Sequence, residues 1–72
     1  MNLDELITII SMCTSINKKD LNSKSCANDF SRWDSLAHIR IMLEIQKKTK
    51  IKISTSKMTE LNSIKSILAY LR

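Results

Sequence analysis

Hydrophobic residues recur at three- and four-residue intervals in three stretches of the chain, which is the period of an amphipathic helix. The first stretch predicts a helix over residues 3–16. Its apolar face comprises Leu3, Leu6, Ile7, Ile10 and Cys13. Asn2 precedes this stretch and Glu5 follows three residues later, which is the pattern of a capping box. The helix is therefore expected to begin directly after Asn2.

The second and third periodic stretches predict two further helices. The second helix is expected to begin at Asp34 or Ser35, either of which is suited to cap it, and to end near Thr49. The last helix is expected to be capped by Asn62 or Ser63. Its apolar face comprises Ile64, Ile67, Leu68 and Leu71.

The second helix has an unusually wide apolar surface. Its polar sector is limited to Arg40, Glu44 and Lys47, and Glu44 is placed to pair with Arg40 or with Lys48. Two apolar stripes flank this sector: Leu36, Ile39 and Leu43 form one, and Ala37, Ile41 and Ile45 form the other. Such a helix is either packed deeply or keeps one face for a partner.

A long polar segment separates the first two helices. Residues 17–33 show no sustained period, and loops of this length in small domains are often functional. Its large apolar residues are Leu21, Phe30 and Trp33, and we expect them to anchor the loop to the core.

The segment between the second and last helices predicts little regular structure. Residues 50–54 alternate in polarity, but no second strand is present to pair with them, so we expect an extended connector whose Ile51 and Ile53 enter the core. A short helix or turn is expected near residues 56–61. Together these elements predict an all-α fold in a single domain over residues 1–72, with three main helices and one short one.

Composition narrows the function classes. The chain has no Gly and no Pro, which excludes glycine-rich phosphate-binding loops. Residues 1–34 hold four basic and five acidic residues, whereas residues 35–72 hold eight basic and two acidic ones. The second half, at a net +6, raises the question of a nucleic acid or another acidic partner.

Few side chains are suited to catalysis or to metal binding. Cys13 and Cys26 are too few for a disulfide scaffold, and His38 is the single histidine, expected at a helix surface or edge. No nucleophilic triad or pair of catalytic acids is evident, so neither an enzyme nor a metal site is expected. The acidic start is unlike a signal peptide and no apolar run is long enough to span a membrane, which predicts a cytoplasmic protein.

Residues 33–41 carry the most informative pattern. The tripeptide Asp34-Ser35-Leu36 stands at a predicted helix start, after a long loop and near the middle of the chain. Here the sequence resembles the acyl carrier protein family, the phosphopantetheine-binding carrier domains, whose signature is Asp-Ser-Leu at the start of the second helix. The resemblance extends along the chain to the final helix and is strongest from Trp33 onward.

The resemblance implies an acyl-carrier-like four-helix bundle with a long loop between its first two helices. It also implies that a phosphopantetheinyl transferase moves a 4′-phosphopantetheine arm from coenzyme A to Ser35. The arm carries acyl groups as thioesters, and the carrier itself catalyses nothing. Asp34, by the same resemblance, helps the transferase to position its metal and coenzyme A.

The resemblance also assigns partner contacts on the second helix. Residues at the positions of Leu36 and Leu43 tend to contact partner enzymes in the family, and Ile39 is placed to line the gap that shelters an acyl chain. Familiar carriers have an acidic second helix, whereas Arg40 and Lys47 make this one basic. We therefore expect a specialised carrier, outside bulk fatty-acid synthesis, for acyl-activating, acyltransferase or synthase enzymes with an acidic or apolar docking face.

Other interpretations of the same residues remain open. In these alternatives, Ser35 is never modified and is only a helix cap. The chain is then a small basic helical module that binds nucleic acid or another protein. The long segment 17–33 does not fit a helix-turn-helix, whose central turn is short. Because arginine is scarce and no aromatic residues interleave with the lysines, nucleic-acid binding is not expected. We expect a monomer.

Overall fold

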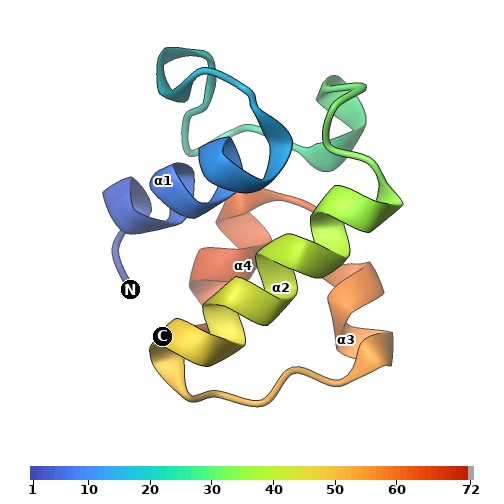
Figure 1. Ribbon diagram of the computed structural model, residues 1–72. Coiled ribbons are helices and arrows are strands. Elements are labelled where there is room, and N and C mark those ends of the chain that lie inside the picture. Colours follow the sequence, from blue (N-terminus) through green and yellow to red (C-terminus); the bar gives the residue numbers. More distant parts are fainter. Residues whose placement is uncertain (72) are drawn as a thin grey trace.

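The computed structural model describes residues 1–71, which form a helical bundle without any strand in that range. The elements are α1 (Leu3–Thr14), η1 (Lys18–Asp20), η2 (Ala27–Asp29), α2 (Ser35–Thr49), α3 (Thr55–Glu60) and α4 (Ile64–Tyr70). Figure 1 shows α2 lying between α1 and the short α3, with α4 behind it. The predicted all-α architecture, with its long loop between the first two helices, is confirmed.

The predicted capping box at the start of α1 is present. The Glu5 amide donates to Asn2 Oδ1 at 2.8 Å, and the Asn2 amide donates to Glu5 Oε1 at 3.2 Å. The helix ends at Thr14, two residues before the predicted end, because Ser15 adopts a left-handed conformation with φ 65°. Ile16 consequently leaves the helix, yet its side chain is still buried in the core.

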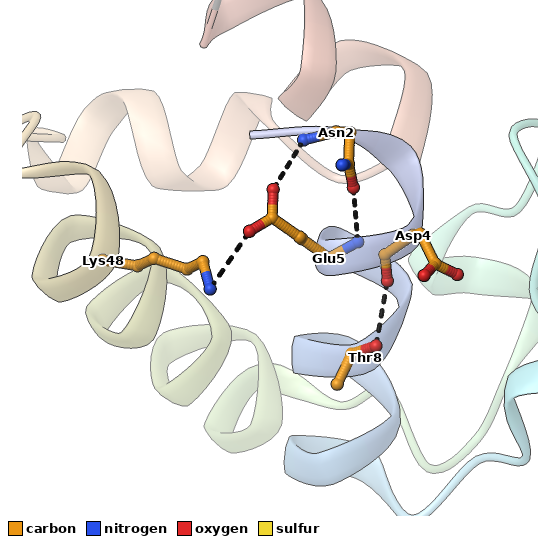
Figure 2. A network of polar contacts seen from close by, with 5 residues as sticks. All are labelled: Asn2, Asp4, Glu5, Thr8 and Lys48. Atoms are coloured by element: carbon orange, nitrogen blue, oxygen red, sulfur yellow. Dashed lines mark hydrogen bonds and ion pairs between the residues drawn. The ribbon is translucent and has the colours of Figure 1, made fainter.

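An ion pair joins the start of α1 to the end of α2 (Figure 2). Lys48 Nζ lies 3.2 Å from Glu5 Oε2. The predicted pairing of Glu44 with Arg40 or Lys48 is wrong for the part of the chain that the structure describes, since neither ion pair is formed there. Lys48 instead reaches the neighbouring helix, where Glu5 is already held by the capping box.

This arrangement predicts a pH dependence. The backbone N–H of Asn2 and then the Lys48 ammonium hold the pKa of Glu5 below its usual value of 4.5. Its contribution to stability is therefore complete above that value and is lost as the pH falls through the lower pKa of the folded state. Glu5→Gln is expected to flatten the pH dependence of the unfolding free energy below about pH 5, measured by urea titration.

Lys48→Met provides the matched variant for this measurement. Lys48→Met leaves the Asn2 hydrogen bond, which is the largest single cause of the lowered pKa of Glu5, so the lysine variant should lose only part of the pH dependence. Equal flattening in both variants would contradict this division between the two contacts.

The core lies where α1, α2 and α4 meet. Its fully buried side chains are Leu6, Ile10, Ile41, Met42, Ile45, Ile64 and Ile67. They come from the predicted apolar faces, except for Met42, which neither predicted stripe of α2 included. Burying each such side chain contributes about 1.5–3 kcal/mol, so this cluster is a main source of stability in so small a domain.

Backbone pairing holds the long loop to the rest of the bundle. The Ala27 amide donates to the Asn62 carbonyl at 2.8 Å, and the Ile64 amide donates to the Ser25 carbonyl at 3.0 Å. Leu21 and Trp33 are buried as predicted, while Phe30 is half-buried against the core. The loop is therefore a fixed part of the structure that leads into α2.

The connector after α2 differs in part from the prediction. Ile53 is buried, but Ile51 is 38% exposed and does not enter the core. Lys50 is left-handed with φ 64°, and the Ile51 amide donates to Thr49 Oγ1 at 3.2 Å. Ile51 thus still belongs to the turn that ends α2, and only the residues after it extend along the core.

Two serines begin the last helices. Ser54 caps α3, which starts at Thr55, one residue before the predicted range. Ser63, of the two residues considered, caps α4 by accepting from the Ser66 amide at 3.1 Å. Ile64 and Ile67 of the predicted apolar face are buried, whereas Leu68 and Leu71 are only half-buried.

Candidate functional site

The start of α2 settles which residue caps it. Asp34 is extended, with φ −89° and ψ −176°, and its Oδ1 accepts from the Ala37 amide at 2.9 Å. Ser35 is the first residue of the helix, its side chain is exposed, and its hydroxyl forms no hydrogen bond within residues 1–71. Asp34 therefore does the capping and the Ser35 hydroxyl stays free.

The position of this hydroxyl suits an anionic substituent. The first backbone N–H groups of a helix have no partner within the helix, and the helix dipole is positive there. A phosphodiester on Ser35 would gain about 0.3–1 kcal/mol from this end of α2. The neighbouring Asp34 carboxylate opposes that gain, although one of its oxygens is engaged by the Ala37 amide.

A groove of about 340 Å³ lies beside Ser35, between α2 and α3. Its lining residues are Ala27, Asp34, Ser35, His38, Ile39, Thr55, Met58, Thr59 and Asn62. Ile39 and Met58 supply its large apolar side chains from the two facing helices. A flexible group attached to Ser35 would therefore have a partly apolar channel directly within reach.

His38 connects the loop, α2 and α3. Trp33 Nε1–H donates to His38 Nδ1 at 2.9 Å, and His38 Nε2 lies 2.8 Å from the Met58 carbonyl oxygen. His38 was predicted at a helix surface or edge, and the ring is half-buried, but its two hydrogen bonds were not predicted. The partners lie five residues before it and twenty after it, so helix periodicity carries no signal for them.

The two stripes of α2 face opposite environments. Ala37, Ile41 and Ile45 are buried, as a core-facing stripe should be. The other stripe is open to solvent: Leu36 is 62% exposed, Ile39 49% and Leu43 55%. Apolar side chains in such an uninterrupted row on one helix are typical of a surface kept for a partner.

This exposed stripe continues onto α1. Met12 is 79% exposed, and it lines a second groove of about 350 Å³ together with Ile9, Cys13, Arg40, Leu43 and Glu44. Met12 was not among the residues predicted to contact a partner. The sequence signal for such a contact was a large apolar residue that lies outside the predicted buried face of its helix.

The charges beside the stripe are mainly positive. Arg40 and Lys47 are exposed and form no ion pair within the described residues, whereas Lys48 is bound to Glu5. Glu44 is the only acidic residue within α2 itself. Apart from Asp34 at its start and Glu44, the exposed face of α2 therefore presents apolar side chains with unpaired cations.

The cysteines and carboxylates do not form a reactive centre. Burial and then the Glu44 carboxylate raise the pKa of the Cys13 thiol, which disfavours its nucleophilic thiolate form at neutral pH. Within residues 1–71 no group of three metal-ligating side chains comes together. Nor does that part of the chain include a helix of the length and apolarity needed to cross a bilayer.

Comparison with known proteins agrees with this geometry. A family model described as a phosphopantetheine attachment site matches residues 8–71, a range that includes Ser35, α2 and both walls of its groove. None of the curated proteins matches the chain. The match covers nearly all of the sequence, and the chain is therefore a member of the phosphopantetheine-attachment family, whose domains bind 4′-phosphopantetheine covalently.

Proposed function

We propose that Ser35 bears the 4′-phosphopantetheine arm and that the protein carries acyl groups on it as thioesters. The observation that carries this proposal is the state of the Ser35 hydroxyl, which is exposed and unbonded at the start of α2, beside a partly apolar groove. When bound, the arm supplies the thiol that holds the acyl group. The protein's own residues supply the attachment point, the shelter and the docking surface.

Attachment requires little of the protein beyond an accessible oxygen. A phosphodiester forms at Ser35 Oγ, the nucleotide part of coenzyme A leaves, and the hydroxyl proton passes to the transferase. Asp34 supports this step if its carboxylate oxygen that is not held by the Ala37 amide meets the transferase's metal. The attached phosphate then lies at the positive end of the α2 dipole.

The protein acts as a carrier in this proposal, and catalysis belongs to its partners. Burial of Cys13 and the raised pKa of its thiol make that side chain a poor acceptor for acyl groups at neutral pH. The two cysteines are free and half-buried, which fits a reducing compartment such as the cytoplasm.

The exposed face of α2 is proposed as the docking surface for acyl-activating, acyltransferase or synthase enzymes. Leu36, Ile39 and Leu43 would fill an apolar patch of the partner, while Arg40 and Lys47 would face acidic side chains. A partner with this polarity is specialised, because the acyl carriers that this chain resembles present an acidic helix instead. We therefore propose a dedicated pathway rather than bulk fatty-acid synthesis.

The test of arm attachment is a mass measurement. The protein is incubated with coenzyme A, magnesium and a broad-specificity phosphopantetheinyl transferase, and the intact mass is then determined. One arm should be added, and proteolytic fragments should place it on Ser35. A chain that gains no mass, or gains it on another side chain, would overturn the proposal.

Charge reversal tests the docking surface. Arg40→Glu is expected to lower kcat/KM for acyl transfer with the native partner enzyme by about tenfold or more at low salt, because it replaces attraction by repulsion. The loss should shrink as salt is added. Lys65→Glu, an exposed lysine of α4 away from the α2 stripe, is the matched control and should transfer normally. Equal kinetics for both variants and wild type would remove Arg40 from the docking surface.

A further inference from the structure

The tautomer of His38 follows from its two partners. The indole nitrogen of Trp33 can only donate a hydrogen bond, so His38 Nδ1, 2.9 Å away, must accept. The ring proton is therefore on Nε2, which donates to the Met58 carbonyl oxygen at 2.8 Å. Both ring nitrogens are thus used, and the ring turns no free polar atom toward the groove beside Ser35.

This contact joins the short helix α3 to α2. The α3 helix has six residues, none of which is fully buried. Met58 is half-buried, and the Lys57 ammonium lies 5.4 Å from the centre of the Tyr70 ring. The bond from His38 is the only hydrogen bond between α2 and α3 among residues 1–71.

The carbonyl that His38 meets is one that the helix leaves without a partner. The last four carbonyl groups of a helix have no intrahelical N–H, and the Met58 oxygen is among them in α3. The Leu61 amide satisfies the neighbouring Lys57 carbonyl instead. His38 therefore serves as a side-chain cap, donated from α2, for the C-terminal end of α3.

We propose that His38 is a positioning residue that sets the width of the groove beside Ser35, with Trp33 fixing the ring and Met58 receiving the bond. The groove has α2 as one wall and α3 as the other, and the His38 ring lines it while tying the walls together. The use of this groove to shelter a thioester rests on the proposed function, whereas the positioning of α3 by His38 does not.

Two variants separate the two hydrogen bonds of the ring. Asparagine places its carbonyl oxygen near the position of Nδ1 and keeps an acceptor for Trp33, and glutamine places its amide nitrogen near the position of Nε2 and keeps a donor for Met58. In the unmodified protein, His38→Asn should speed hydrogen exchange of the α3 amides by about tenfold. His38→Gln should leave that exchange close to wild type.

The arm-bearing protein provides the functional readout. With an octanoyl arm loaded from octanoyl-coenzyme A, His38→Asn should lose the thioester to hydroxylamine several-fold faster than wild type, while His38→Gln should resemble wild type. Nitrogen NMR of the wild-type ring should show the proton on Nε2, as the tautomer assignment requires.

The outcomes distinguish this proposal from the proposed function. Equal α3 exchange in the asparagine and glutamine variants, or a wild-type ring with its proton on Nδ1, would overturn the positioning role. Both measurements use unmodified protein, so they stand even if no arm is ever attached. Unequal α3 exchange with equal thioester loss would confine His38 to holding α3 and remove its role at the groove.

Discussion

Ser35→Ala is expected to stay entirely unmodified under conditions that convert the wild-type protein completely to the arm-bearing form. The variant lacks the one hydroxyl group at the start of α2, which is exposed and unbonded in the wild-type protein. Asp34 already accepts the Ala37 amide and is a carboxylate, so it cannot form the same phosphodiester. Intact-mass measurement after the transferase reaction gives the result directly.

The same variant should fold normally, which makes the result interpretable. Asp34 provides the helix cap, and alanine has the highest helix propensity of any residue, so the unfolding free energy should stay within about 0.5 kcal/mol of wild type. Ser31→Ala removes an exposed loop hydroxyl four residues earlier and should accept the arm like wild type. An arm on the Ser35→Ala protein would contradict the assignment.

The second large effect concerns the two faces of α2. Ile41→Ala is expected to lower the unfolding free energy by about 2–5 kcal/mol, because Ile41 is fully buried at the centre of the core and its loss leaves a cavity. Small domains have only about 5–15 kcal/mol of stability, so much of the population would unfold under mild denaturant. Urea titration followed by circular dichroism measures the loss.

Ile39→Ala is the matched control, since it makes the same change two residues earlier on the same helix. Its side chain is half exposed, and a change of about 1 kcal/mol or less is expected. The difference in unfolding free energy between the two variants shows how much more the core-facing stripe contributes to stability than the solvent-facing one. Similar losses at both positions would contradict that separation.

Helix starts were predictable because their signals are local. Asn2 and Glu5 lie three residues apart, and Ser63 caps the last helix with atoms of its own turn. The end of α2 at Thr49 was predicted, whereas α1 stops two residues before its predicted end, at a left-handed residue that is not glycine. Ser15 carries no sequence mark of that conformation.

Contacts between distant residues account for most of what the sequence did not show. The partner of Lys48 is Glu5 on the neighbouring helix, so the expected pairing within α2 does not form. The pairing of Ser25 with Ile64 uses backbone groups, which every residue type provides equally. No pattern along the chain encodes such pairings, although the length of the loop indicated that something must hold it.

The candidate site also combines features that local sequence signals predict with contacts between distant residues that they do not. Ser35 was predictable from its tripeptide and its place at a helix start, but which of Asp34 and Ser35 caps the helix required the geometry. The contacts of His38 required it too, because Trp33 and Met58 come from a loop and a different helix. The tripeptide therefore predicts the attachment point, whereas the contacts around it were seen only in the structure.

The uncovered apolar stripe of α2 also bears on how identical molecules meet in solution. An interface between two copies related by a twofold axis brings the same surface of each into contact. Arg40 of one molecule would then approach the cationic face of the other, and their mutual repulsion opposes dimerisation. The same charge that would select an acidic enzyme would thus disfavour pairing of two copies through the bare stripe.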